Sequence, residues 1–150
     1  KLVEYRNISK WVKISTPSIY KKTIQLEEKG LIRGKIVKEG KMPEKVIYSL
    51  TEAGESEFER LMFEISSAPI NIFLDFNAVI VNLDALPDEK QRVCVAEIQE
   101  NINTLKIYLE ENIEEKENDP TIPATGMAVL RQQYVLAEAI QTWINSLDFV

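Results

Sequence analysis

The sequence predicts a mainly α-helical fold with a small β hairpin, divided into domains at residues 1–67 and 68–150. Three observations predict it. A helical segment that begins near a Pro and ends at a Gly is followed by two short stretches of strand composition. Residues 1–50 hold 12 Lys or Arg against 5 Asp or Glu, whereas residues 51–150 hold 6 against 19. The second half also carries apolar residues three and four positions apart, which is typical of paired helices.

The chain opens within a segment of helical periodicity. Several apolar side chains there fall on one face: Leu2, Val3, Tyr5 and Ile8. Because this pattern starts at Lys1, we expect the first helix of the domain to be missing from this sequence. Trp11 is interpreted as a core residue, with a surface contact as the alternative.

The central element is a helix expected to begin at Thr16 or Pro17 and to end at Gly30. Thr16 can cap it with its hydroxyl, and Gly30 can adopt the left-handed conformation that closes a helix. One stripe suits a core: Ile19, Thr23 and Leu26. Another stripe suits phosphates and base edges of DNA: Ser18, Lys21, Lys22 and Gln25. A preceding helix, a connection and this helix together predict a helix-turn-helix.

Two strands are expected next, at residues 31–38 and 45–50, because strand composition replaces the helical period. Gly40 and Pro43 favour a turn between them. The hairpin is interpreted as the wing of a winged helix, with three lysines around its tip that we expect to contact DNA phosphates: Lys38, Lys41 and Lys45. On the second strand, alternation predicts one face that can pack on the helices: Val46, Tyr48 and Leu50.

Thr51 is expected to cap a further helix, since Thr is a good cap and Glu52 favours the positive helix end. Its apolar residues are Phe58, Leu61, Met62 and Ile65. The break at residues 66–69 is the predicted domain boundary, because it contains a Pro and basic residues become rare beyond it.

Motifs spread over residues 16–54 point to a family. They are a Thr-Pro pair, Tyr20 early in the helix, Leu-Glu-Glu-Lys-Gly-Leu-Ile at 26–32, and Tyr-Ser-Leu-Thr-Glu-Ala-Gly at 48–54. This run resembles the winged-helix domain of PadR-family transcriptional regulators, although the family's usual His-Gly-Tyr region and Gly-Arg-Pro-Arg-Lys style of wing are absent. The resemblance implies that Tyr20 contacts a phosphate, that Thr16 belongs to the DNA-binding set, and that helical C-terminal domains form a homodimer.

Three helices are expected in the second half. Ile70–Leu83 is interpreted as a buried helix, because it is apolar nearly all round. Pro87 and Asp88 open a long helix that should end before Asp119. Its seam is Val95, Ile98, Ile102, Leu105 and Leu109. The last helix, beyond Pro123, has an apolar stripe too: Met127, Leu130, Tyr134, Ala137, Ile140, Ile144 and Leu147.

The seam requires an opposing helix, which could come from a second copy or from residues 125–148 of the same chain. For a homodimer, the predicted contact residues are Ile98, Ile102, Leu105, Leu109, Leu130, Tyr134 and Ile144. Dimerisation also follows from function, because a two-fold protein can place two recognition helices roughly 34 Å apart on palindromic DNA.

Many PadR relatives respond to small hydrophobic or aromatic effectors. Six aromatic residues could line such a site: Phe58, Phe63, Phe73, Phe76, Tyr134 and Trp143. Of these, Phe73, Phe76 and Trp143 are the candidate effector residues. The alternative is that each aromatic residue packs in a core, as large aromatics at helical spacing normally do.

Composition excludes several classes of function. The chain has no His and one Cys, Cys94, so the usual zinc sites and His-dependent nucleophile pairs are absent, and its five glycines form no phosphate loop. We therefore expect no enzyme activity, metal or cofactor. A single Cys fits a reducing compartment, so the cytoplasm is expected. The apolar run at residues 70–83 is too short to span a bilayer.

These observations predict a cytoplasmic, homodimeric PadR-like regulator, a repressor that reads a palindromic operator on double-stranded DNA and responds to a small hydrophobic or aromatic effector. One alternative is a winged helix that contacts proteins and does not read DNA sequence. Another is a DNA-binding protein without an effector.

Overall fold

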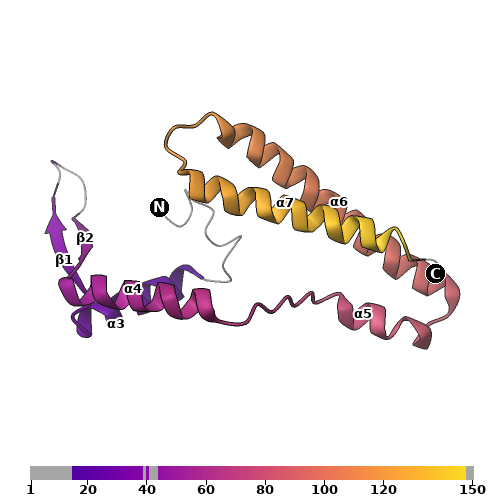
Figure 1. Ribbon diagram of the computed structural model, residues 1–150, viewed down its shortest axis with the longest axis horizontal. Helices are drawn as coiled ribbons and strands as arrows, with labels where there is room; N and C mark the ends of the chain where they lie inside the picture. Colours follow the sequence, from indigo (N-terminus) through magenta and orange to yellow (C-terminus); the bar gives the residue numbers. More distant parts are fainter. Residues whose placement is uncertain (1–14, 39, 41–43, 148–150) are drawn as a thin grey trace. The chain divides into compact units, whose positions relative to one another are not determined.

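The structure, a computed structural model, describes residues 15–38, 40 and 44–147 of the chain (Figure 1). Along the sequence its elements are α3 (Thr16–Glu28), β1 (Ile32–Val37), β2 (Lys45–Leu50), α4 (Glu52–Ser67), α5 (Asn77–Val81), the 3-10 turn η1 (Leu83–Ala85), α6 (Asp88–Glu117) and α7 (Ala124–Ile144). The predicted fold class, mainly α with one antiparallel hairpin, is confirmed. The predictions for Leu2, Val3, Tyr5, Ile8, Trp11 and Lys41 lie outside the described residues.

The chain divides into two compact units between Asn71 and Ile72. The N-terminal unit contains α3, the hairpin and α4, and the C-terminal unit contains α5 to α7. The predicted assignment of residues 1–67 and 68–150 to DNA binding and dimerisation stays a prediction.

Helix α3 begins at Thr16, one of the two predicted starts, but its N-cap is the preceding residue. Ser15 is the N-cap: its hydroxyl oxygen accepts a hydrogen bond from the Ser18 amide at 3.3 Å, and its backbone is extended. The prediction that Thr16 caps the helix was wrong, because Thr16 already has helical backbone and Pro17 fits within the first turn. Gly30 follows the helix with a φ of +70°, as predicted for a residue that closes a helix C-terminus.

Strands β1 and β2 form one antiparallel pair that projects as a hairpin (Figure 1). Three residue pairs share one face: Ile32 with Leu50, Gly34 with Tyr48, and Ile36 with Val46. The predicted alternation of Val46, Tyr48 and Leu50 onto one face is therefore confirmed. Their expected packing on the helices is incomplete within the described chain, since their exposed fractions are 49%, 39% and 51%.

The two ends of the hairpin are joined by hydrogen bonds. The Thr51 amide donates to the Leu31 carbonyl at 3.1 Å, and the Thr51 hydroxyl donates to the Gly30 carbonyl at 2.6 Å. The same hydroxyl oxygen caps α4 by accepting from the Gly54 amide at 3.1 Å, which confirms the predicted cap. Gly54 lies so close to the Leu31 carbonyl oxygen that a Cβ would overlap it. Two of the motifs that carry the family resemblance, at residues 26–32 and 48–54, thus meet in space.

The segment Ile70–Leu83 is not the continuous buried helix that its composition predicted. Helix α5 spans five residues, and three apolar side chains before it are exposed: Ile70 (92%), Ile72 (68%) and Phe73 (86%). A short apolar run is compatible with several conformations, and residues 69–74 have no helical structure here. Only the end of the segment is buried, where Leu83 is 2% exposed.

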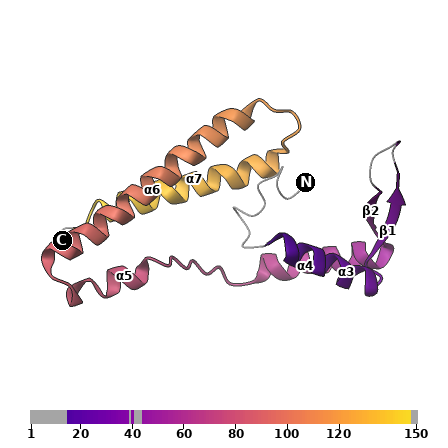
Figure 2. The ribbon, with the colours of Figure 1, turned by 180° about the vertical axis from the view of Figure 1, so that it is seen from behind.

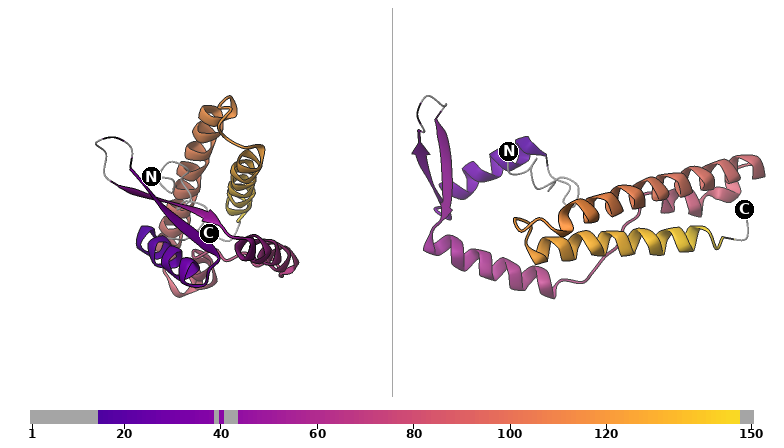
Figure 3. Two further views of the ribbon diagram at one scale, coloured as in Figure 1. Left: turned by 90° about the vertical axis from the view of Figure 1, so that its left-hand side faces the viewer. Right: turned by 90° about the horizontal axis from the view of Figure 1, so that it is seen from above.

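Helices α6 and α7 lie side by side and antiparallel in the C-terminal unit (Figures 1 and 2), and the views along other directions agree (Figure 3). Their core cluster consists of Leu83, Val95, Ile98, Ile102 and Ile144, with Phe76, Ile80, Cys94, Ile140 and Leu147 packed against it. Leu109, Met127 and Ala137 are also buried. The predicted seam therefore packs against α7 of the same chain, which decides between the two alternatives.

This packing changes the predicted dimer contacts. Ile98, Ile102, Leu109 and Ile144 are at most 9% exposed within one chain, so their side chains are not available to a partner. Leu105 was also predicted to lie in the seam, but its side chain is 43% exposed. Leu130 and Tyr134 are half-buried, so with Leu105 they stay predictions as dimer contacts.

Polar contacts also cross between α6 and α7. The Lys106 ammonium donates to the Gln141 side-chain oxygen at 2.7 Å and lies 3.7 Å from the Glu138 carboxylate. Farther along, Arg131 donates to the Glu117 carboxylate at 2.8 Å. These contacts add polar links between the two helices at positions outside the apolar core.

Candidate nucleic-acid interface

The predicted polar stripe of α3 lies on its surface. Ser18, Lys21 and Lys22 are exposed, and the helical period brings them onto one face. Gln25, one turn farther, is half-buried. The opposite side is formed by Ile19 and Thr23, which are half-buried, with the Thr23 hydroxyl bonded to the Ile19 carbonyl at 2.9 Å. This face offers two ammonium groups, a hydroxyl and an amide to a partner.

Tyr20 is 72% exposed on the flank of this stripe. Its phenol is therefore available for the phosphate contact that the family resemblance implies. The side chain of Thr16 is outside the described part of the structure.

The wing lysines have different surroundings. The Lys38 ammonium lies 3.7 Å from the Glu44 carboxylate, and both side chains are largely exposed. Lys45 is exposed and pairs in register with Val37. The attraction between Lys38 and Glu44 is weak in water, but Glu44 lowers the positive potential at the end of the hairpin.

Sequence reasoning missed two cations of the wing. Arg33 and Lys35 are exposed and lie on the same face of the hairpin as Lys45, opposite the face that bears Gly34 and Tyr48. The signal was present in the sequence, because strand alternation separates Arg33 and Lys35 from the apolar Ile32 and Ile36. These residues extend the candidate basic surface from the tip of the wing along its length.

The carboxylate of Glu27, at the end of α3, contacts the wing. The Gly34 amide of β1 donates to its Oε1 at 2.9 Å. Tyr48 of β2 pairs with Gly34 across the hairpin, so its phenol lies near the same carboxylate. Partial burial of the phenol, then the negative charge of Glu27, raise the pKa of Tyr48 above its usual value. Helix α3 thus contacts the hairpin at a position where its two strands are paired.

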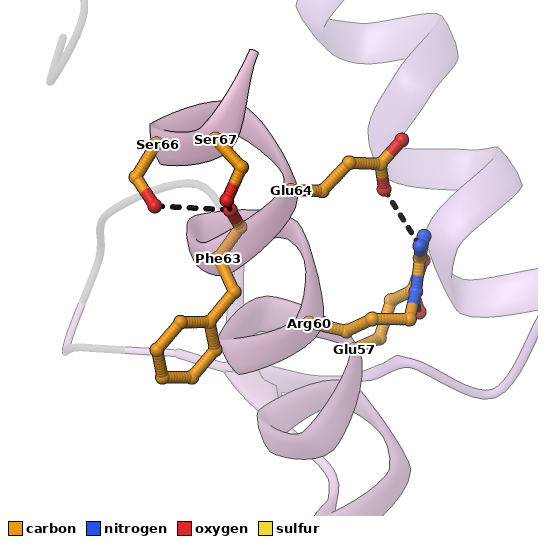
Figure 4. Close-up of polar contacts among 6 residues, drawn as sticks. All are labelled: Glu57, Arg60, Phe63, Glu64, Ser66 and Ser67. Atoms are coloured by element: carbon orange, nitrogen blue, oxygen red, sulfur yellow. Dashed lines mark hydrogen bonds and ion pairs between the residues drawn. The ribbon is translucent and has the colours of Figure 1, made fainter.

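Helix α4 carries a cation that is already paired (Figure 4). Arg60 donates two hydrogen bonds to Glu57, at 2.7 and 2.9 Å, and one to Glu64 at 2.6 Å. The bond from Arg60 lowers the pKa of Glu57. On the last turn the Ser66 and Ser67 hydroxyls both donate to the Phe63 carbonyl at 2.9 Å. Because Arg60 is paired within its own helix, we do not include it in the candidate interface.

The three candidate effector residues do not form one group. The rings of Phe76 and Trp143 stack, with centroids 6.0 Å apart, at the end of the C-terminal core. Phe73 is 86% exposed, so it lines no enclosed site within this chain. Phe58 and Phe63 are also exposed, at 55% and 74%, which contradicts the alternative that each aromatic is a core residue.

Comparison with known proteins places this arrangement in a family. Residues 4–60 match the sequence model described as "Transcriptional regulator PadR-like family". The chain carries a PadR-like domain. The resemblance predicted from the motifs at either end of the wing is thereby confirmed. No curated protein matches the sequence of this chain.

Solved structures share the fold over nearly the whole chain. Bacillus subtilis PadR in complex with operator DNA has a TM-score of 0.82 at 15% identity, covering 97% of this chain and 83% of PadR. Streptococcus mutans smu.1604c has a TM-score of 0.69 at 21% identity, covering 95% and 84%. The PadR-like transcriptional regulator BC1756 from Bacillus cereus has a TM-score of 0.69 at 18% identity, covering 96% and 80%. At such identities the likeness establishes the fold.

Two searches of the described residues gave negative results. No group of three or more acidic, His or Cys side chains is arranged to hold a metal ion there. Within that same part of the chain, no helix combines the length and apolar character needed to cross a bilayer.

Proposed function

We propose that this PadR-like chain is a transcriptional regulator that binds double-stranded DNA through α3 and the wing. One observation carries the proposal: α3 exposes Ser18, Lys21 and Lys22 on one face of a fold that PadR uses in its complex with operator DNA. Helix α3 enters the major groove, where these side chains and Gln25 reach phosphates and base edges. Lys38, Lys41 and Lys45, together with Arg33 and Lys35, hold the wing on the backbone.

The charge distribution supports this proposal. Residues 1–50 carry a net charge of +7 and residues 51–150 a net charge of −13. Only the first region is attracted to a polyanion, and counterion release by its lysines makes binding salt-dependent. The DNA complex therefore forms on the N-terminal unit.

The test is binding to duplex DNA from upstream of the protein's own gene, against a scrambled duplex, at about 50 and 200 mM salt. We expect tight, sequence-selective binding by the wild type. Replacement of both Lys21 and Lys22 by Ala should lower the slope of log affinity against log salt by about 1.8, if each contacts one phosphate. Lys90→Ala removes an exposed cation from the C-terminal unit and is the matched control. Equal binding by all variants would favour a protein-contact module instead.

We further propose that the regulator is a homodimer. The support is apolar surface outside the core: Ile70, Ile72, Phe73 and Val81 are 68 to 92% exposed in the single chain. Exposed apolar side chains gathered in one short segment of chain are typical of surfaces that a partner covers. Phe73→Asp should shift the protein from dimer to monomer in light scattering, whereas Lys90→Ala should not. A Phe73→Asp variant of unchanged mass would contradict the use of this surface.

Repression of a palindromic operator and control by a small hydrophobic or aromatic effector complete the proposal. The stacked pair Phe76 and Trp143 offers an aromatic surface to such a compound. Phenol and indole derivatives should then quench the fluorescence of Trp143, and Trp143→Phe should remove that part of the response. A ligand can change DNA binding only if its affinity differs between two geometries of the dimer. Quenching of Trp143 should therefore be accompanied by a change in the affinity for DNA. Quenching without such a change would contradict the effector role.

A further inference from the structure

The Glu27 side chain of α3 forms a hydrogen bond to strand β1 of the wing, at the residue that pairs with Tyr48 of strand β2. Its Oε1 accepts from the Gly34 amide at 2.9 Å, and its negative charge contributes to the raised pKa of the Tyr48 phenol. Gly34 and Tyr48 are direct neighbours across the strand pair. One carboxylate therefore fixes α3 to the hairpin at a register position where the two strands are themselves paired.

The backbone at Gly34 makes this approach possible. A Cβ there would lie 2.9 Å from Glu27 Oε1, 2.9 Å from Val46 Cγ1 and 3.0 Å from Tyr48 Cε1. These distances are too short for ordinary contacts, so a side chain here would force at least one of these three groups to shift. The glycine is explained by the close approach of its neighbours and needs no unusual backbone angle.

Local electrostatics do not account for a carboxylate at this position. Glu27 lies in the last turn of α3, where a negative charge opposes the helix dipole. It also adjoins a face proposed to meet phosphates, which would repel it. The next residue, Glu28, bears the same charge in the same turn and is exposed. The two differ in that Glu27 contacts the wing.

We propose that Glu27 is a positioning residue that fixes the angle between the recognition helix and the wing, so that both reach the same stretch of DNA. The inference rests on the proposed function, because the junction, meaning the hydrogen bond between Glu27 and Gly34, is given a role in DNA binding. A wing that is held in place loses less conformational freedom on binding, which favours its contacts with the backbone. Without the junction, α3 would still bind DNA but the wing would contribute little.

Three full-length variants test this proposal. Glu27→Ala removes the junction, Glu27→Gln keeps an oxygen that can accept from Gly34, and Glu28→Ala removes the same charge without touching the wing. By charge alone, both Ala variants should bind DNA more tightly. We expect Glu27→Ala to bind about tenfold more weakly, the effect of one lost charge-assisted hydrogen bond, and to show a lower salt slope. Glu27→Gln should bind within about threefold of the wild type.

A second measurement separates this inference from the proposed function. Hydrogen exchange of the Gly34 amide in the free protein should be faster in Glu27→Ala than in Glu28→Ala or Glu27→Gln. If the wild type binds no DNA, the proposed function fails and the positioning role fails with it, even where exchange confirms the junction. If the wild type binds and the two Ala variants have equal affinity and salt slope, the positioning role alone is overturned.

A folding defect would not leave the question open. Should Glu27→Ala lose its helical circular dichroism, Tyr48→Phe decides, because it removes only the hydroxyl of the residue that pairs with Gly34 and whose pKa Glu27 helps to raise. A lower salt slope in Tyr48→Phe supports the positioning role, and an unchanged slope contradicts it.

Discussion

The two units of this chain are organised by different interactions. All eight apolar side chains that are buried in the described structure belong to the C-terminal unit. In the described part of the N-terminal unit, the only buried residue is Gly54, and its elements are joined by directional hydrogen bonds from Glu27 and Thr51. The C-terminal unit should therefore respond to changes of volume, and the N-terminal unit to changes of single polar atoms or single methyl groups.

The largest effect is expected from Ile144→Ala in the C-terminal core. Ile144 is 1% exposed and belongs to the central cluster. Loss of its side chain should lower the free energy of unfolding by about 2–5 kcal/mol, because a cavity remains. Urea denaturation followed by circular dichroism measures it. Val135→Ala, at a position 60% exposed in the same helix, is the control and should change little.

Gly54→Ala should have the next largest effect. The new Cβ would overlap the Leu31 carbonyl oxygen, so the end of the hairpin and the start of α4 would have to separate. We expect a loss of about 1–3 kcal/mol in the unfolding free energy. Gly126→Ala is the matched control, since its Cβ would meet nothing nearer than 3.7 Å within α7, and it should stabilise the protein by about 0.5–1 kcal/mol. Effects of the same sign would contradict this explanation.

Thr51→Val should cost less, about 1 kcal/mol, which is typical for loss of an N-cap. The hydroxyl has two partners, the Gly30 carbonyl and the Gly54 amide, and Val keeps the shape while removing both bonds. Thr51→Ser retains the oxygen and should be close to the wild type in urea denaturation. A Ser variant as unstable as the Val variant would show that the methyl group, and not the hydroxyl, is what α4 requires.

The smallest expected effect is on the pH dependence of stability, through Tyr134 in the C-terminal unit. Partial burial, then the negative charges of Glu138 and Glu110, raise the pKa of Tyr134 above its ordinary value of 10.0. The folded state thus holds the phenol proton more firmly than the unfolded state. Stability from this group is complete below about pH 10 and falls as the pH rises through the folded-state pKa. Tyr134→Phe should show a smaller decline between about pH 9 and 11 than the wild type, and parallel curves would contradict the assignment.

Much of the N-terminal unit was predictable, because its signals are local. Gly30 and Thr51 mark a helix end and a helix start through their own backbone and hydroxyl chemistry, and the structure places both as predicted. The cap at Ser15 was missed because three candidate caps, Ser15, Thr16 and Ser18, lie close together in sequence. Glu27 was missed for another reason: its partner Gly34 is found only when the hairpin is placed against α3.

In the C-terminal unit the two long helices were predictable, but the helix that covers the apolar stripe of α6 was not. The spacing of Val95, Ile98 and Ile102 identified a buried stripe, which the structure confirms. Spacing carries no information on which helix covers the stripe, so the choice between α7 and a second copy had to come from the fold. The conformation of Ile70–Leu83 could not be predicted from composition, because apolar runs occur both in buried helices and on exposed surfaces.

The hydrogen bonds of Thr51 to Gly30 and Leu31 have an evolutionary consequence. They hold the end of α3 next to the start of α4, whatever chain runs between them. The wing is therefore an insert with fixed ends. Because the entropy of closing a loop rises only slowly with its length, such an insert can grow, shrink or be exchanged at small cost to the rest of the domain. Descendants of one protein could in this way acquire wings suited to different DNA while keeping the same pair of helices.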